Sequence, residues 1–170
     1  MKRKGILVVG LLVFVVGVYY LLGGFAPLEI EMSTCEDFRL TGLYYQGTPQ
    51  DEALGDTFRS VEGLISNHAG SFLHTIYEVE PAGKLDTMRV FVGTVLPSHE
   101  EGFEWMSVSC REAIVATIRA HRFVMPSPLS VKAQIQSFAD EQGLELSGVF
   151  IDRLQGASEV SVWAPLAIEE

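Results

Sequence analysis

One order of predicted elements, strand–helix–strand–strand, occurs twice along this sequence of 170 residues. The strands are predicted from short alternating runs rich in bulky residues, and the helices from apolar residues three and four positions apart. In the first copy the strands are predicted at residues 38–45, 72–80 and 88–96. In the second copy they are predicted at residues 113–120, 149–154 and 160–163, the last two joined around Gly156. The repeat predicts an α+β fold of duplicated β-α-β-β modules, at about residues 28–97 and 103–168.

Each predicted helix begins at a hydroxyl residue followed by proline, at Thr48-Pro49 and at Ser127-Pro128. A hydroxyl side chain can cap the first turn, and proline fits the first helical position because its missing N–H would have no partner there. The apolar face of the first helix consists of Leu54, Phe58, Val61 and Ile65, and this helix ends at residues 67–70. The apolar face of the second consists of Val131, Ile135 and Phe138, and this helix ends at Gly143.

The only two cysteines, Cys35 and Cys110, each precede the first strand of one module. They therefore mark equivalent points of the repeat. In an oxidising compartment two such cysteines tend to form a disulfide. Equivalent positions need not be close in space, however, and a disulfide requires Cα atoms within about 7 Å. Two separate, partly buried thiols are the alternative.

Residues 6–22 form an apolar run without a charge, close to the roughly 20 residues that cross a bilayer. It predicts a retained, single-pass membrane anchor at residues 1–27, and a cleaved signal peptide is the alternative. Lys2, Arg3 and Lys4 precede the run, whereas acidic residues follow it. Positive flanks stay on the cytoplasmic side, which predicts a cytoplasmic N-terminus and an extracytoplasmic domain at residues 28–170, periplasmic if the host is bacterial.

The charge of the domain limits its partners. All 22 acidic residues follow the apolar run, whereas three of the 12 basic residues precede it. Nucleic-acid binding requires a basic surface for phosphate contacts, so we expect no nucleic-acid partner. The expected partner is a hydrophobic small molecule or another protein.

Signatures of catalysis and of cofactor binding are absent from the sequence. It contains no G-x-S-x-G, phosphate loop, H-E-x-x-H or C-x-x-C. His99-Glu100-Glu101 is interpreted as a solvated acidic loop, because adjacent loop residues rarely converge on one metal ion. We therefore predict no catalytic residue, no metal site and no cofactor.

Several short motifs, taken in order, resemble the GyrI-like domain of gyrase inhibitors and multidrug-sensing regulators. They are Gly42-Leu43-Tyr44, the segment from Tyr77 to Pro81, the arginine-bearing segment 86–93, and Ala164-Pro165-Leu166. The resemblance covers about residues 28–168 and implies the duplicated fold. A membrane span directly before such a domain also resembles a testis-expressed receptor family used in selective autophagy of the endoplasmic reticulum.

The resemblance implies a ligand cleft between the two modules, lined by aromatic residues. It places the contacts on the strand after each helix, so Tyr77 and Phe150 should face each other, with Tyr45 and Trp163 nearby. Sensors of cationic drugs in the family carry a buried glutamate at a position that Phe150 matches here. Asp152 lies two residues further and so shares its face, which makes it the expected polar group of the cleft.

Three functions are compatible with these observations. The first is a membrane-anchored domain that binds a small hydrophobic ligand. The second is a membrane-tethered interaction or scaffold protein without a ligand. The third is a small-molecule hydrolase that uses an acid in the cleft.

Overall fold

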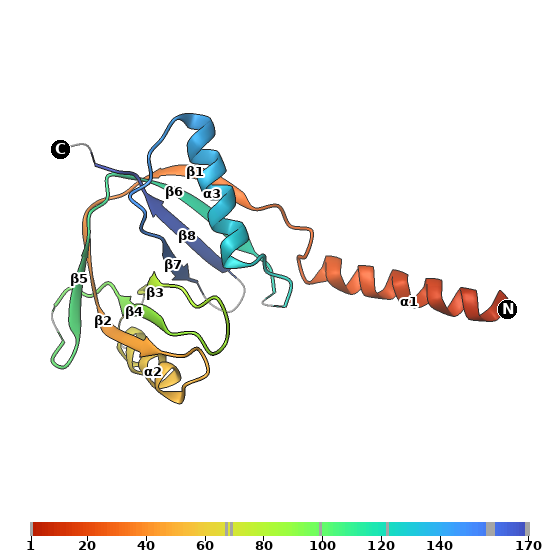
Figure 1. Ribbon diagram of the computed structural model, residues 1–170, viewed down its shortest axis with the longest axis horizontal. Helices are drawn as coiled ribbons and strands as arrows, with labels where there is room; N and C mark the ends of the chain where they lie inside the picture. The colour runs from red at the N-terminus through yellow and green to blue at the C-terminus, as the bar shows by residue number, and fades with distance from the viewer. Residues whose placement is uncertain are drawn as a thin grey trace.

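The structure is a computed structural model that describes residues 2–66, 68, 70–98, 100–121, 123–155 and 159–168, with side chains from residue 10 onward. Within these residues, three helices and eight strands are present, and all eight strands belong to one antiparallel sheet (Figure 1). The predicted α+β class and the β-α-β-β order of both modules are confirmed. The predicted turn at Gly156 and the interpretation of His99 lie outside the described residues.

The first module consists of β2 (Phe38–Gly47), α2 (Glu52–Ser66), β3 (Leu73–Val79) and β4 (Met88–Thr94). The second consists of β6 (Glu112–Arg119), α3 (Pro128–Gln142), β7 (Ile151–Leu154) and β8 (Glu159–Pro165). Two strands had not been predicted: β1 (Glu29–Thr34) precedes the first module and β5 (Glu104–Val108) precedes the second. Both lie at the edges of the sheet and are mostly exposed, so neither shows the continuous apolar pattern of a buried strand.

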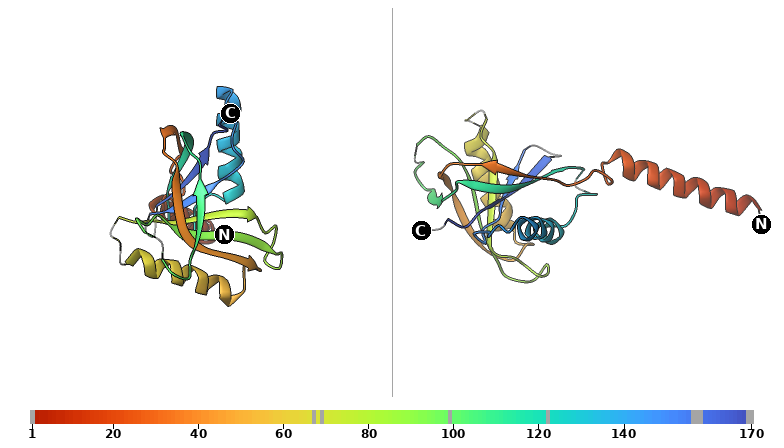
Figure 2. Two further views of the ribbon diagram at one scale, coloured as in Figure 1. Left: turned by 90° about the vertical axis from the view of Figure 1, so that its left-hand side faces the viewer. Right: turned by 90° about the horizontal axis from the view of Figure 1, so that it is seen from above.

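The strand order β1-β6-β8-β7-β3-β4-β2-β5 reads the same from both ends when the two modules are exchanged. Its centre is the pair β3 and β7, in which Thr75 lies opposite Asp152. Each edge strand belongs in sequence to one module but pairs with the other: β1 pairs with β6, and β5 pairs with β2 (Figure 2). The two modules are therefore joined by exchanged edges as well as by the central pair.

The exchange brings the two cysteines together. The chain between β1 and β2 and the chain between β5 and β6 meet, and Cys35 and Cys110 form a disulfide with Cα atoms 5.5 Å apart. Hydrogen bonds join the same segments: the Cys35 N–H donates to the Arg111 carbonyl over 2.9 Å, and the Cys110 N–H donates to an Asp37 carboxylate oxygen over 2.8 Å. Equivalent residues are neighbours here because the two connections run in opposite directions between the modules and cross.

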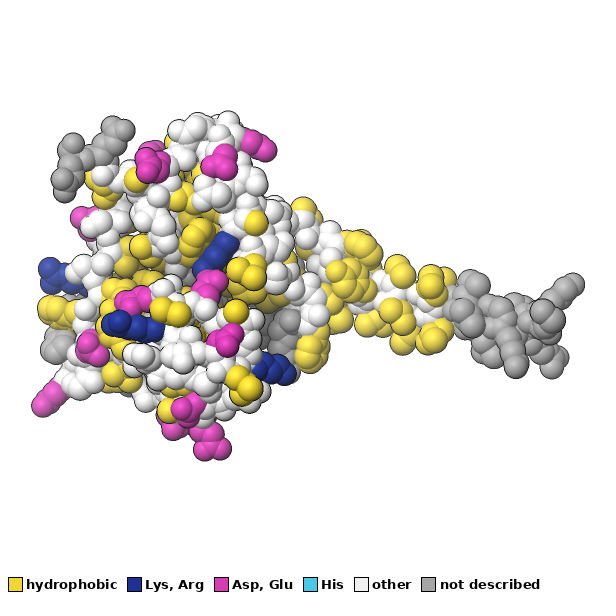
Figure 3. Space-filling view, in the orientation of Figure 1, with side chains coloured by type: hydrophobic (Ala, Val, Ile, Leu, Met, Phe, Trp, Pro, Cys, Tyr) yellow, Lys and Arg dark blue, Asp and Glu magenta, His cyan; other side chains and the backbone are white. Residues whose placement is uncertain are grey.

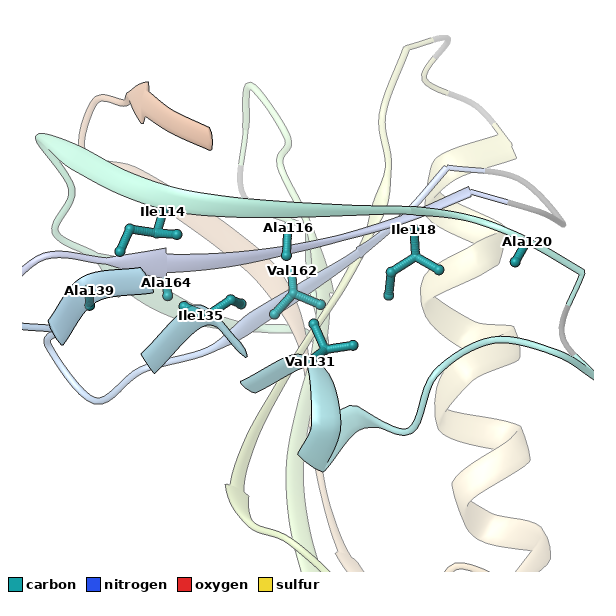
Figure 4. Packing of buried hydrophobic residues seen from close by; sticks show 9 residues of the cluster. All are labelled: Ile114, Ala116, Ile118, Ala120, Val131, Ile135, Ala139, Val162 and Ala164. Atoms are coloured by element: carbon teal, nitrogen blue, oxygen red, sulfur yellow. The ribbon is translucent and has the colours of Figure 1, made fainter. Parts of the chain in front are cut away.

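Both module helices pack on one face of the sheet, over separate hydrophobic clusters. Helix α3 places Val131, Ile135 and Ala139 against β6 and β8 (Figure 4). Helix α2 places Val61 against residues of β2, β3 and β4. On the opposite face, a third cluster packs Phe91 and Ile151 against Leu40 of β2. The two helices therefore leave the centre of their shared face, over β3 and β7, open between them.

The start of α3 follows the prediction, whereas the start of α2 does not. The Ser127 hydroxyl oxygen accepts a hydrogen bond from the Ser130 N–H, Pro128 begins the helix, and Gly143 ends it with a positive φ of 68°. In α2, the backbone N–H of Asp51 donates to the Thr48 carbonyl in a turn, and the Asp51 carboxylate accepts from the Ala53 N–H over 3.0 Å. An acidic cap three residues after Thr48 therefore begins this helix.

We expect Ser127→Ala to lower the free energy of unfolding by about 1 kcal/mol, because the first turn of α3 loses its side-chain cap. Ser137→Ala is the matched control. The Ser137 hydroxyl donates to the Ala133 carbonyl on the exposed side of the same helix, and alanine is the better helix former there. Urea unfolding monitored by circular dichroism should show a loss for the first variant only. An equal loss for both would contradict the assigned cap.

Helix α1 (Lys2–Leu21) projects away from the sheet (Figures 1 and 2). Hydrophobic side chains cover its described part (Figure 3), and Leu11, Phe14 and Tyr20 are each more than 60% exposed. The side chains of residues 6–9, where the predicted anchor begins, lie outside the described ones. In the described part of the chain, no helix is long and apolar enough to cross a membrane.

Candidate functional site

A cavity of about 450 Å³ lies between the two modules on the helix-bearing face of the sheet. The first module contributes Phe58 from α2 and Thr75 and Tyr77 from β3. The second contributes Asp152 from β7, Val160 and Val162 from β8, and the segment that runs from Met125 into the first turns of α3. Apolar side chains make up most of this lining. We call this cavity the cleft.

Asp152 is the acidic group of the cleft lining, and the register of the sheet places it at the centre. It lies directly opposite Thr75 of β3 and Val162 of β8. Burial raises the pKa of the Asp152 carboxyl from 3.8 to about 6, Lys132 opposes this effect, and Glu80 adds to it. Asp152 can therefore hold or release a proton near neutral pH.

Lys132 connects the two modules beside Asp152. From the second turn of α3, its ammonium group pairs with the Glu80 carboxylate, which follows β3. The same ammonium lies 4.7 Å from the centre of the Phe150 ring, a cation–π distance. Because Lys132 already pairs with Glu80, the three ionisable groups carry a net negative charge when Asp152 is ionised.

Two of the five residues predicted for the ligand site, Tyr77 and Asp152, lie together in the cleft lining. Phe150 lies next to them but outside the lining: it packs against the α3 cluster and under Lys132. It therefore does not face Tyr77 across the cavity as expected. Tyr45 is buried in the cluster beneath α2, and its hydroxyl donates to the Thr48 carbonyl over 2.8 Å.

Trp163 lies on the other face of the sheet, away from the cleft. In β8 the side chains alternate, so that Val162 faces the cleft while Trp163 and Ser161 face the opposite side. The Trp163 indole N–H donates to the Ser161 hydroxyl over 3.1 Å. The alternation of side chains along a strand does not show by itself which set faces the cleft. On either face of this sheet an aromatic residue would be buried.

The sequence interpretation missed Thr75, Met125 and Lys132 as lining residues. Thr75 can be identified as a lining residue only from its register with Asp152. Met125 lies in the apolar segment 123–126 before α3, and an apolar loop beside a helix start was the available signal. Within the described residues, no group of three His, Cys, Asp or Glu side chains could hold a metal ion.

The fold matches solved structures at low sequence identity. A hydrolase from Listeria innocua superposes with a TM-score of 0.61 at 8% identity, over 82% of this chain and 92% of that one. The C-terminal domain of EcmrR gives 0.58 at 8% identity, over 84% and 99%. SAV2435 bound to tetraphenylphosphonium gives 0.51 at 11% identity, over 82% and 94%. These similarities support the GyrI-like fold that the sequence motifs resemble.

No protein-family model matches the sequence, and a comparison with curated proteins gives no match. EcmrR has also been solved in a complex with DNA, so the expectation that this chain has no nucleic-acid partner stays a prediction. The similarity to a receptor of endoplasmic-reticulum autophagy likewise stays a prediction.

Proposed function

We propose that this protein binds a small hydrophobic molecule in the cleft, with a cationic or hydrogen-bond-donating group of the ligand placed against Asp152. The observation that carries the proposal is a carboxylate on the floor of an apolar cavity. Within the described residues, the ion pairs do not include Asp152. A partly desolvated carboxylate whose neighbouring lysine, Lys132, already pairs with Glu80 is a site for a positive ligand.

The size and lining of the cleft suit a compact ligand. Its volume of about 450 Å³ falls within the range of small-molecule sites, which are mostly apolar with a few polar groups that fix orientation. Tyr77 and Val162 supply flat or branched apolar surface on either side of Asp152. That SAV2435 has been solved with an organic cation supports the same choice of ligand class.

Titration of the full chain with two probes of similar shape tests the proposal. Tetraphenylphosphonium is cationic and triphenylphosphine oxide is neutral. We expect Asp152→Asn to weaken binding of the cation by about tenfold or more and to leave binding of the neutral probe nearly unchanged. Tyr77→Ala should weaken both, because it removes shared apolar surface.

Glu78→Gln is the matched control for this titration. It removes one carboxylate from the strand next to β7, but Glu78 pairs with Arg89 over 2.9 Å and does not line the cleft. Overall charge changes equally in the two variants, so only a local effect of Asp152 can separate them. Equal losses in Asp152→Asn and Glu78→Gln would refute the assigned role.

A hydrolase is the second candidate, favoured by the pKa of Asp152 and by solved neighbours described as hydrolases. A carboxyl group with a pKa of about 6 can exchange a proton near neutral pH, as general acid–base catalysis requires. Hydrolysis of p-nitrophenyl esters by the wild-type chain, abolished in Asp152→Asn, would support this function. The absence of turnover in both, with the cation bound, would leave binding as the function.

We also propose that the domain folds in an oxidising compartment. The support is the Cys35–Cys110 disulfide, since such bonds persist mainly in secreted or periplasmic proteins. Alkylation of thiols in intact cells, before lysis, should leave both cysteines unlabelled until a reductant is added. Labelling of both without a reductant would place the domain in a reducing compartment.

A further inference from the structure

A second cavity, of about 420 Å³, lies on the opposite face of the central strands. Its lining includes His74 of β3, Arg153 of β7 and Trp163 of β8, together with Phe72 and Phe38. The disulfide-linked segment before β2 borders it through Cys35. The second cavity shares no lining residue with the cleft, although β3, β7 and β8 contribute to both.

Two polar atoms in this lining lack hydrogen-bond partners. His74 is only 7% exposed, and its Nδ1 has no partner within the described residues; the same holds for Nε of Arg153. The two residues lie directly opposite each other in the pairing of β3 with β7. Buried polar groups are nearly always paired, so two unpaired neighbours that line one cavity indicate a missing polar partner.

The missing partner has to suit a positive charge. The Arg153 guanidinium carbon lies 4.0 Å from the centre of the Phe72 ring and 6.0 Å from that of Trp163, and the ion pairs of the described residues do not include Arg153. Burial, and then the charge of Arg153, lower the pKa of His74 to about 4, so this ring is neutral at physiological pH. Arg153 thus supplies the positive charge of a lining that is otherwise largely aromatic and apolar, with Glu36 exposed at its rim.

We propose that the second cavity is a binding site for a small aromatic carboxylate. The carboxylate pairs with the guanidinium of Arg153, and the flat ring packs among Phe38, Phe72 and Trp163. A guanidinium binds a carboxylate through parallel, charge-assisted hydrogen bonds, which are stronger inside an apolar wall than in water. The two faces of β7 would then select opposite charges, with Asp152 in the cleft and Arg153 in the second cavity.

The alternative occupant is a water molecule. One water could accept from Arg153 Nε and donate to His74 Nδ1, which would satisfy both atoms without a ligand. A cavity of this volume exceeds the space that one water needs, and apart from Thr34, Glu36 and Ser71 its walls offer further waters few partners. The test therefore has to separate a site for an organic anion from a hydrated pocket.

Titration of the full chain with 2-naphthoate, and with neutral 2-naphthamide, makes this separation. The readout is the indole N–H resonance of Trp163 in ¹⁵N-labelled protein, which reports on this face of the sheet. We expect naphthoate to shift the resonance saturably, and Arg153→Met to weaken its binding by about tenfold or more while binding of naphthamide changes little. Arg59→Met, the matched control, removes the same charge from an exposed arginine of α2 that pairs with Asp56 and lines neither cavity, so it should leave naphthoate affinity unchanged.

Glu36→Gln keeps the test decisive if Arg153→Met disturbs folding. This exposed variant removes a negative charge from the rim, so it should strengthen naphthoate binding modestly and leave naphthamide unaffected. The proposal is overturned if naphthoate does not bind the wild-type chain, which would indicate a hydrated pocket. It is also overturned if naphthoate affinity is unchanged in both Arg153→Met and Glu36→Gln, or if it falls equally in Arg153→Met and Arg59→Met. Its failure would leave the proposed function of the cleft untouched.

Discussion

Replacement of both cysteines, by Cys35→Ala and Cys110→Ala, is expected to lower the free energy of unfolding by about 4 kcal/mol. The disulfide closes a loop across a sequence separation of 75 residues, so its loss frees a large part of the unfolded chain. The loop contains the whole first module, and the bond links the two connections that cross where the edge strands are exchanged. Urea unfolding of the double variant beside the oxidised wild type measures the loss.

Two comparisons isolate the contribution of the bond. Ser33→Ala changes a half-buried side chain two residues before Cys35, whose hydroxyl donates to the Thr34 carbonyl, and should change stability by less than about 0.5 kcal/mol. Wild-type protein treated with a reductant should unfold like the double variant. If the reduced and oxidised proteins were equally stable, the disulfide would not fasten the two modules together.

Substitution of Asp152 by asparagine is expected to stabilise the protein at about pH 7, by on the order of 2 kcal/mol, while weakening the cation site. The folded state raises the pKa of this carboxyl to about 6 from 3.8, so the folded protein disfavours its ionised form. The contribution of the wild-type carboxyl to stability is therefore fully present below about pH 4 and is lost as the pH rises through about 6. Asparagine does not ionise and avoids that loss.

The difference in unfolding free energy between wild type and Asp152→Asn, measured at several pH values, tests this account. The advantage of the variant should be largest above about pH 6 and should shrink toward pH 4. The contribution of His74 to stability has the opposite pH dependence. Its pKa is lowered to about 4, so its contribution is present above its ordinary pKa and is lost as the pH falls. Its contribution cancels because both proteins contain His74. A difference that did not vary with pH would show that Asp152 is not desolvated.

Binding of a cationic ligand should depend on the same titration of Asp152. Its affinity should rise with pH, whereas the stability contribution of the carboxyl falls. Affinity for tetraphenylphosphonium in the wild type should fall by about tenfold between pH 7 and pH 5, since the ionised fraction of a group with a pKa of about 6 falls by that factor. Binding of neutral triphenylphosphine oxide should not fall. Asp152 thus lowers the stability of the folded state and also selects the ligand, a combination that is common at binding sites.

The module order was predictable because each element leaves a local pattern. Helix α3 could be placed from its serine–proline start, its apolar spacing and its terminal glycine, all of which act within one or two turns. The start of α2 could not, because Thr48 and Asp51 are both good caps and the turn between them decides which one is used. Asp152 and Tyr77 were predictable as cleft residues once the family resemblance indicated where the modules meet.

The remaining features depend on tertiary contacts that local patterns do not record. The edge strands β1 and β5 are held by pairing with the other module, so their sequences need no apolar face. The family resemblance predicted Trp163 near the cleft, but the register of β8 with β6 and β7 turns this side chain to the opposite face of the sheet. The proximity of Cys35 and Cys110 follows from the crossing of two connections, which neither segment encodes alone.

We expect a hydrophobic cation to bind in the cleft against Asp152, on the helix-bearing face of the sheet. Intermolecular nuclear Overhauser effects between tetraphenylphosphonium and methyl-labelled protein test this binding mode. We expect contacts from the phenyl protons to the methyl groups of Met125, Val131 and Val162, which all line the cleft. Contacts to Ile151 or Val95, which line the opposite cavity, without any to the cleft methyl groups would contradict it.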